Sequence, residues 1–331
     1  MNRAFFLFLL TLGALLAQAP SGPEMAKRPP RPPKPGIKTP GVTRPITTIT
    51  PSKIFTIEKV PDWVAVGPDA IWFSRRPDST LNRLDPVKNE IVATIPIGQK
   101  QCSGMVYGFD SMWLPHCGEP NLYRVDTKLN KVVAKIPLAV AASEGGITAT
   151  DDSVWMLTEK GHVLVRIDPD TNKVVAEIVT PPGCYDAASG FGSVWVTCTE
   201  SNLLLRVNPR NNLIEQRIPV ANGPRFLATG EGAVWTLSEA DGAVSRIDPK
   251  TNKVEATIET GVPRGGDIAV GEGAVWVSGF EFPLTRIDAA TNQAVQQWSG
   301  KGGDAVRVAF GSVWLSYLRE GFLWRIDPKT L

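Results

Sequence analysis

Short runs of apolar or alternating residues, separated by Gly, Pro, Asp and Asn, follow one another from residue 52 to residue 331. Alternation with a period of two is typical of β-strands, and no segment has the three-to-four spacing of a helix. In one representative unit the pattern predicts strands at 226–229, 233–237, 242–247 and 254–258. The residues between them, at 230–232 and 248–252, are those that tight turns favour. The pattern therefore predicts an all-β chain.

A tryptophan motif and an arginine motif recur seven times in this part of the chain. The tryptophans lie 38 to 42 residues apart and are Trp72, Trp113, Trp155, Trp195, Trp235, Trp276 and Trp314. Ten or eleven residues after each comes an arginine of an RIDP-like motif, and these are Arg83, Arg124, Arg166, Arg206, Arg246, Arg286 and Arg325. Four strands in about 40 residues is the size of a propeller blade. The repeat predicts a seven-bladed β-propeller with four antiparallel strands per blade.

The ends of the repeat predict how the ring closes. The seventh unit stops at Leu331, directly after its turn at 327–330, and so lacks a fourth strand. Residues 53–57 resemble the fourth strand of the other units, such as 253–258. An N-terminal strand that completes the last blade would close the ring and remove two open sheet edges. We expect the N-terminal strand to complete the last blade.

Residues that recur in every unit are expected to build the fold. A buried tryptophan removes on the order of 200 Å² from water, worth up to roughly 5 kcal/mol at about 25 cal/mol per Å². The seven tryptophans are therefore expected in the core between blades. Each repeated arginine is expected to meet a carboxylate or carbonyl nearby, because a half-buried guanidinium without a partner costs several kcal/mol.

The repeat motifs resemble a known group of bacterial proteins. GEGAVWVS at 271–278 and RIDPKTNKVEATI at 246–258 are similar to the units of YVTN-repeat propellers and of streptogramin (virginiamycin B) lyases, and the likeness covers 52–331. In those lyases, the resemblance implies, a histidine that opens the first strand of particular blades acts as general base beside Mg²⁺. The matching positions here are Asp62, Ser103, Gly145, Tyr185, Arg225, Gly266 and Asp304. None is a histidine, so the resemblance supports the fold more than the activity.

Variable residues at the start of each innermost strand are the candidates for a binding site. One mouth of the channel is expected to carry Asp62, Glu144, Asp186, Asp267 and Asp304 together with Tyr185, Arg225 and Arg307. His116 is added as a binding candidate in a loop at the same rim. Converging charges in a concavity are typical of binding sites. In the alternative interpretation these are solvated rim residues that pair with one another.

A divalent cation is one ligand that the mouth could take. Glu144, Asp186 and Asp267 are the candidate ligands, because Mg²⁺ and Ca²⁺ prefer carboxylate oxygens. The sequence thus predicts a propeller that binds a small molecule, a metal or a protein partner at the channel mouth. The alternative is a divalent-metal-dependent lyase, or a hydrolase or lactonase, that uses the same mouth. No G-x-S-x-G motif is present.

The four cysteines predict two disulfides. Cys102 and Cys117 flank Trp113, and Cys184 and Cys198 flank Trp195, at positions that face each other in a hairpin of the first two strands. We expect the pairs Cys102–Cys117 and Cys184–Cys198, each worth roughly 3 kcal/mol in the chain-entropy model. A thiolate zinc site is the rival, but the close C-x₂-C spacing is missing.

The N-terminal 51 residues differ from the repeat. Residues 1–19 have the layout of a secretory signal peptide, with cleavage after Ala17 or Ala19. Residues 20–51 contain ten prolines, six Lys or Arg and one acid, and are expected to form a disordered basic linker. No apolar stretch is long enough to span a membrane. We expect a secreted or periplasmic protein.

Charge limits the possible partners. The linker could contact anionic polymers of the cell envelope. Without the linker and Arg3, the chain has 28 Lys and Arg against 32 Asp and Glu. A mildly acidic body gives no support for nucleic-acid binding.

Overall fold

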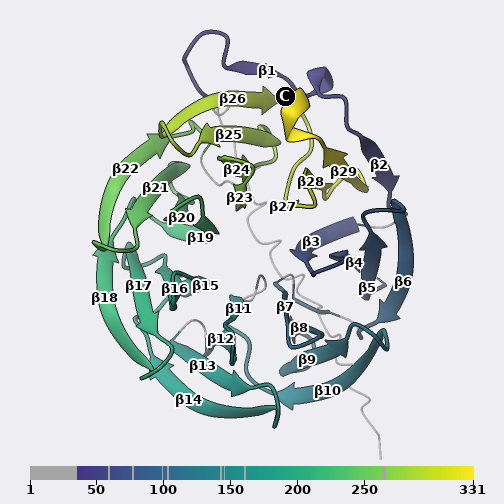
Figure 1. Ribbon diagram of the computed structural model, residues 1–331, viewed down its shortest axis with the longest axis vertical. Coiled ribbons are helices and arrows are strands. Elements are labelled where there is room, and N and C mark those ends of the chain that lie inside the picture. The colour runs from purple at the N-terminus through teal and green to yellow at the C-terminus, as the bar shows by residue number, and fades with distance from the viewer. Residues whose placement is uncertain are drawn as a thin grey trace, which may run out of the picture. The chain divides into compact units, whose positions relative to one another are not determined.

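The computed structural model describes residues 36–331, apart from 59, 77, 99, 103, 142–143, 145, 160–161 and 263–265. In these residues seven β-sheets are arranged in a ring, and the strand that directly precedes each tryptophan-bearing strand is innermost (Figure 1). The predicted seven-bladed propeller with four antiparallel strands per blade is confirmed. The predicted signal peptide at 1–19 and the first part of the predicted linker lie outside the described residues.

The first four blades each consist of four consecutive strands. Blade 1 contains β3 (Val60–Val66), β4 (Ile71–Arg76), β5 (Thr80–Asp85) and β6 (Glu90–Pro96). Blade 2 contains β7 (Val106–Gly108), β8 (Ser111–His116), β9 (Asn121–Asp126) and β10 (Lys131–Pro137). Blade 3 contains β11 (Ile147–Ala149), β12 (Val154–Thr158), β13 (Val163–Asp168) and β14 (Lys173–Val179). Blade 4 contains β15 (Cys184–Gly190), β16 (Ser193–Cys198), β17 (Leu203–Asn208) and β18 (Leu213–Pro219).

The last three blades complete the ring. Blade 5 contains β19 (Pro224–Gly230), β20 (Ala233–Ser238), β21 (Ala243–Asp248) and β22 (Lys253–Glu259). Blade 6 contains β23 (Asp267–Gly271), β24 (Ala274–Ser278), β25 (Leu284–Asp288) and β26 (Gln293–Ser299). Blade 7 contains β27 (Val306–Ala309), β28 (Ser312–Tyr317), β29 (Phe322–Ile326) and β2 (Lys53–Thr56). Two short 3₁₀ helices, η1 (Ile46–Thr48) and η3 (Pro328–Thr330), lie outside the sheets.

The N-terminal strand closes the ring as predicted. β2 pairs antiparallel with β29, and Phe55 lies opposite Leu323 in the register. The buried ring of Phe55 stacks on Trp314 with 6.0 Å between centroids. The innermost strands β27 and β3 are neighbours, as are the innermost strands of every other consecutive pair of blades. Blades 7 and 1 therefore adjoin and complete the circle.

Residues 36–51 differ from the linker that their composition predicts. β1 (Thr43–Pro45) adds a fifth strand to blade 6 by pairing parallel with β26. Ile46 and Ile49 are buried against blades 6 and 7. The side chain of Gln297 accepts a hydrogen bond from the Ile37 amide at 2.8 Å. The proline-rich segment is thus held in place by two buried isoleucines and by strand pairing with the outer edge of blade 6.

The repeated tryptophans and arginines form one interaction in blade after blade. All seven tryptophans are fully buried, and the guanidinium of each repeated arginine lies over the tryptophan of its own blade. In blade 4, Arg206 also donates across to blade 5, to the Pro249 carbonyl at 2.7 Å and to Asn252 Oδ1 at 2.8 Å. The predicted carbonyl partner of the arginine is found, and it belongs to the neighbouring blade. We call this contact the arginine bridge.

The same arginine bridge joins most neighbouring blades. Its arginines are Arg83, Arg124, Arg166, Arg206, Arg246 and Arg325, each with a carbonyl of the next blade. Arg286 of blade 6 is the exception in the described residues, because its guanidinium reaches only Gln296 of its own blade, at 3.4 Å.

Both predicted disulfides are present. Cys184 and Cys198 are register partners in β15 and β16, and Cys102 bonds to Cys117 at the end of β8. None of the described cysteines is free. Among the described residues, none of the helices has the length and apolar character that crossing a membrane requires.

Loss of one arginine bridge should destabilise the ring measurably. Arg206→Ala leaves Ser193, the Pro249 carbonyl and Asn252 without the charged donor. We expect it to lower the free energy of unfolding by about 2–3 kcal/mol. Arg286→Ala, which breaks no bond between blades, is the matched control and should cost clearly less. Urea unfolding followed by tryptophan fluorescence measures both, and equal losses would contradict the bridge.

Candidate functional site

The seven innermost strands keep a common register against their tryptophans. The residue seven positions before each tryptophan is its Cα partner, and these residues are Ala65, Val106, Thr148, Ala188, Ala228, Ala269 and Arg307. Equivalent positions therefore lie at one level around the channel. Arg307 is the one charged residue of this level.

The level two residues earlier combines rings, carboxyls and small residues. Its members are Trp63, Gly104, Gly146, Asp186, Phe226, Asp267 and Ala305. Trp63 of blade 1 and Phe226 of blade 5 meet with their ring centroids 5.9 Å apart. These two blades are not neighbours, so the rings reach across the channel. The three small residues leave space beside them. Asp186 and Asp267 come from the blades on either side of Phe226.

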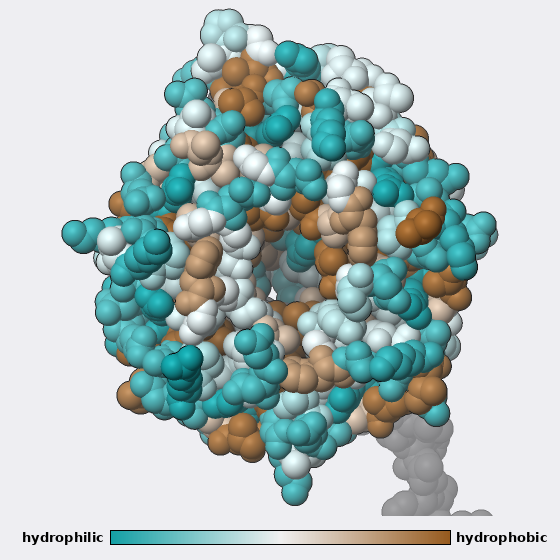
Figure 2. Space-filling view, viewed as in Figure 1, coloured by the Kyte–Doolittle hydropathy of each residue, from teal (hydrophilic) through white to brown (hydrophobic). Residues whose placement is uncertain are grey.

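A cavity of about 250 Å³ lies in the channel at these two levels and beyond them toward the ends of the innermost strands. Residues from all seven blades line it, and Figure 2 shows a hollow at the centre of the ring. The charged residues of its lining are Asp186, Asp267 and Arg307. The remaining lining is largely aliphatic, with the hydroxyls of Thr148 and Ser189. The cavity thus offers a small number of charged groups on an apolar wall.

Asp267 is buried and has a cationic partner. Its carboxylate forms an ion pair with Arg307 and accepts hydrogen bonds from the amides of Ile268 at 2.9 Å and Val306 at 3.0 Å. Burial raises the pKa of Asp267, while the Arg307 guanidinium opposes that rise. Arg307 also lies over the ring of Trp63, 5.1 Å from its centroid. The Asp267 carboxylate is therefore neutralised within the protein.

Asp186 occupies the equivalent position in blade 4, but it has no ion-pair partner in the part of the chain that the structure describes. Its carboxyl accepts hydrogen bonds only from backbone amides, from Ala187 at 2.8 Å and Leu227 at 3.1 Å. Burial raises the pKa of Asp186 to about 7 and the negative charge of Asp267 adds to the rise, while the two amide hydrogen bonds and the charge of Arg307 oppose it. At the position where blade 7 has Arg307, blade 5 has Ala228. The cavity wall therefore contains one carboxyl without a neutralising side chain.

A separate network lies at the starts of the innermost strands. Arg225 forms ion pairs with Glu144 and Glu239, both at 2.9 Å. The Tyr185 hydroxyl donates to Glu144 and accepts from Arg225 at 2.7 Å. The Arg225 guanidinium also lies 4.6 Å from the centre of the Tyr185 ring. Glu144, Tyr185 and Arg225 do come together as predicted, but they do not line the cavity.

Two further acids accompany this network. Asp62 is buried and forms an ion pair with Arg76 at 3.0 Å. Burial raises the pKa of Asp304 to about 8, and the charges of Asp62, Asp267 and Glu144 raise it further. Asp62, Asp267 and Glu144 thus act electrostatically on Asp304. Neither Asp62 nor Asp304 lines the cavity.

His116 lies apart from the channel. It is buried at the end of β8, where its ring stacks on Tyr123 with 4.6 Å between centroids. Its Nδ1 accepts a hydrogen bond from the Glu119 amide at 2.9 Å. Because β8 is the second strand of blade 2, the side chain packs within the blade instead of lining the mouth. The structure thus places the binding candidate His116 in the protein interior.

The three candidate metal ligands do not meet. Glu144 belongs to the Arg225 network, whereas Asp186 and Asp267 bind backbone amides of successive blades. Over residues 36–331, gaps excepted, no three His, Cys, Asp or Glu side chains form a group that could hold a metal ion. The carboxylate set predicted for Mg²⁺ or Ca²⁺ is therefore divided between two parts of the site.

Sequence reasoning missed the aromatic pair. Trp63 and Phe226 stand in the same strand positions as Asp186 and Asp267, so a register alignment could have shown them. Their large side chains decide where the channel narrows. Glu239 and Arg76, the other missed residues, come from second strands or the loops after them, and no repeat position identifies them.

Comparison with known proteins bears on the fold. No family model and no curated protein matches the chain. A streptogramin B lyase structure matches with a TM-score of 0.72 and 16% identity, over 83% of this chain and 96% of that chain. The fold is that of streptogramin B lyase. The expected structural likeness is thereby confirmed.

Two structures of virginiamycin B lyase from Staphylococcus aureus agree with this match. A selenomethionine form matches at 15% identity, and a catalytically inactive histidine-to-alanine variant with quinupristin matches at 14%. Both have a TM-score of 0.70 and cover 83% of this chain and 98% of theirs. At 14–16% sequence identity, the similarity to these lyases establishes the fold of the chain and no more.

The raised pKa of Asp186 predicts a pH-dependent stability. A carboxyl that titrates at about 7 when folded and near 3.8 when unfolded binds more protons in the folded state between these values. Its contribution to the free energy of unfolding is present at low pH and is lost as the pH rises toward 7. Asp186→Asn should therefore gain stability relative to the wild type from pH 4.5 to pH 7.5, measured by urea unfolding.

A turn aspartate provides the control for this prediction. Backbone hydrogen bonds lower the pKa of Asp248, so Asp248→Asn should show no such relative gain above pH 5. A difference between Asp186→Asn and the wild type that stays constant across this pH range would contradict the buried, high-pKa carboxyl.

Proposed function

We propose that this protein is an exported β-propeller that binds a small ligand bearing a protonated amine in its central channel. The observation that carries the proposal is the Asp186 carboxyl, which lines the cavity without an ion-pair partner. A bound ammonium would supply the missing cation and favour the ionised carboxylate. The amine is expected to contact the Asp186 carboxylate, in the part of the cavity that lies between blades 4 and 6.

The cavity limits the rest of the ligand. A volume of about 250 Å³ is near the lower end of small-molecule pockets, so the ligand should be smaller than a typical drug. Ile147, Leu227 and Val308 provide apolar lining for a short hydrocarbon body. Thr148 and Ser189 add hydroxyls for one or two hydrogen bonds. A short aliphatic amine with a polar group fits this lining.

The network of Glu144, Tyr185 and Arg225 at the starts of the innermost strands, here called the strand-start network, is less suited to bind the ligand. The carboxylates of Glu144 and Glu239 share the Arg225 guanidinium, and Asp62 is paired with Arg76. A ligand that entered this network would have to replace existing ion pairs, whereas a ligand at Asp186 replaces none. This difference favours the channel cavity over the strand-start network as the binding position.

Export is supported by the cysteines and by the first residues of the sequence. Two disulfides are compatible with an extracellular location, because thiols stay reduced in the cytosol. The apolar segment at 1–19 supplies the signal for export in this proposal, and the basic segment at 20–35 can contact anionic envelope polymers.

Acid–base catalysis in the same cavity is the second candidate function. A general base works best when its pKa lies near the working pH, and the pKa of Asp186 is raised to about 7. The lyase fold adds a reason to test this chemistry. Quinupristin is larger than the cavity, so only one part of the molecule could reach Asp186 from the opening. Incubation with quinupristin, followed by chromatography with and without EDTA, would detect conversion. Conversion that Asp186→Asn abolishes would favour this candidate over simple binding.

Amine binding is testable by calorimetry with a matched ligand set. Pentylamine should bind the wild type, whereas pentanol and pentanoate, which have the same chain without the cation, should bind at least tenfold more weakly. The affinity for pentylamine should rise between pH 6 and pH 8, because Asp186 loses its proton in this range while the amine stays charged. Titrations with MgCl₂ and CaCl₂ test the cation alternative in the same experiment.

Two variants locate the site. Asp186→Asn should abolish pentylamine binding, while Asp304→Asn, which changes an acid outside the cavity lining, should retain it. The reverse pattern would move the site to the strand starts. Equal binding of pentylamine and pentanol would refute the charge-based part of the proposal.

A further inference from the structure

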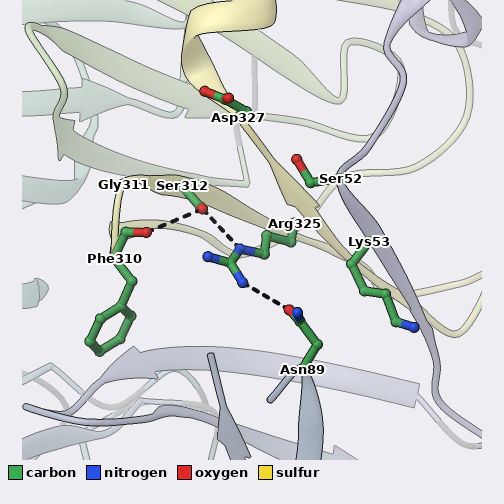
Figure 3. Close-up of a pocket in the computed structure, with 8 residues that line it drawn as sticks. All are labelled: Ser52, Lys53, Asn89, Phe310, Gly311, Ser312, Arg325 and Asp327. Carbon is green, nitrogen blue, oxygen red and sulfur yellow. Dashed lines mark hydrogen bonds between the residues drawn. The ribbon is translucent and has the colours of Figure 1, made fainter. Parts of the chain in front are cut away.

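The closure of the ring contains a second, polar pocket. It has a volume of about 220 Å³ and lies between the N-terminal strand, the turn of blade 7 before β28, and the outer turn of blade 1 (Figure 3). Ser52, Lys53, Asn89, Gly311, Ser312 and Arg325 line it. Its centre is the arginine bridge of blade 7. The pocket belongs to the closure of the ring and shares none of its lining residues with the channel cavity.

One nitrogen of Arg325 has no partner in this pocket. Its Nε donates to Ser312 Oγ at 3.0 Å, and its Nη1 donates to Asn89 Oδ1 at 2.8 Å and to the Pro86 carbonyl. Figure 3 shows the remaining nitrogen directed toward the side of Phe310 and Gly311, without a contact to the residues drawn. Two N–H donors of a guanidinium are thus available to a ligand.

Other blades show what such a nitrogen binds. In blade 1, Arg83 Nη2 donates to the Asp69 carboxylate at 2.6 Å. In blade 3, Arg166 Nη2 donates to the Asp152 carboxylate at 2.8 Å. Both aspartates stand three residues before the tryptophan, in the turn between the first two strands. Blades 4 to 7 have glycine at this position, and in blade 7 it is Gly311, so its arginine lacks this carboxylate partner, as Arg206 of blade 4 does.

Blade 7 also has an additional cation beside the arginine. Lys53 is the register partner of Arg325 across β2 and β29. The residues at this position in blades 1 to 6 are Ala93, Ala134, Ala176, Gln216, Ala256 and Gln296. Two like charges directly opposite each other on neighbouring strands are unfavourable. The only carboxylate of the lining, that of Asp327, accepts a hydrogen bond from the Lys329 amide at 2.9 Å.

We propose that this pocket binds a small oxyanion between Arg325 and Lys53. One oxygen accepts a hydrogen bond from Nη2 of Arg325, at the place where blades 1 and 3 put an aspartate. The Lys53 ammonium, which Figure 3 shows turned away from that nitrogen, would rotate toward the anion to meet a second oxygen. The shared chemistry is that of phosphate, sulfate and carboxylate groups. Because Asn89 and Pro86 belong to blade 1, the anion would strengthen the contact between the first and last blades.

Thermal unfolding with sodium phosphate tests the site. At constant ionic strength set with NaCl, millimolar phosphate should raise the Tm of the wild type along a saturable curve. Lys53→Ala, which restores the alanine of most other blades, should weaken the apparent phosphate affinity by about tenfold. Lys253→Ala, at the start of the fourth strand of blade 5, is the matched control and should respond like the wild type. A phosphate response that Lys53→Ala leaves unchanged would overturn the proposal.

Gly311→Asp is a second variant, in which the new aspartate side chain would take the place of the anion. A Cβ at Gly311 meets no atom within 4 Å, and Asp110 occupies the equivalent position of blade 2 with a φ of 52°, close to the 64° of Gly311. The new carboxylate should repel or replace the anion and remove the phosphate response. Undiminished phosphate binding by Gly311→Asp would argue against this position.

Phosphate, sulfate and acetate distinguish the chemical classes of anion that the pocket could bind. Stabilisation by phosphate and sulfate, but not by acetate, identifies a tetrahedral inorganic anion as the ligand class. Stabilisation by acetate as well extends the class to carboxylates, including those of acidic peptides. An increase in Tm that grows without saturation and is equal in the wild type and Lys53→Ala reflects a general salt effect, and it would refute the site.

Discussion

The arginine bridge is the contact on which the ring depends. A propeller blade buries both faces against its neighbours, and the fully buried tryptophans fill that space without specifying which blade comes next. The arginine adds direction, because it lies over the tryptophan of its own blade and donates to a turn of the following one, as Arg206 does with Pro249. This link recurs at six of the seven junctions between blades in the described residues, around the axis that the seven innermost strands share. The channel and its cavity are consequences of that repetition.

Function can then arise from departures from the repeat at equivalent positions. Asp186 and Asp267 have the same backbone hydrogen bonds, each from the amide of the next residue and from an amide of the next blade. They differ in the charge supplied by the next blade, because blade 7 has Arg307 where blade 5 has Ala228. The two carboxyls thus share their backbone hydrogen bonds, but only that of Asp267 has an ion-pair partner among the described residues. The propeller can thus vary one residue of the channel while its scaffold stays the same.

The sequence predicted the parts of the fold that recur and missed those that occur once. Spacing of the tryptophans sufficed for the blade number, and the strand at 53–57 and both disulfides followed from positions within the repeat. The contact between Trp63 and Phe226 joins blades that are not neighbours, so no local pattern reveals it. The docking of Ile46 and Ile49 was hidden by the prolines around them. The candidate acids were found together, but their division between cavity and strand starts depends on burial and pairing.

The exception at Arg286 gives the N-terminal extension a mechanical role. Blade 6 makes no arginine bridge to blade 7 among the described residues, so the junction of these two blades lacks a link that the others share. Ile46, Ile49 and Trp298 pack there with Tyr317 and Leu315 of blade 7. The segment at 36–51 therefore packs over the one junction between blades that lacks an arginine bridge in the described residues. Because this segment precedes β2 along the chain, tension applied to the N-terminus would act on the junction of blades 6 and 7 before it reached the strand that closes the ring.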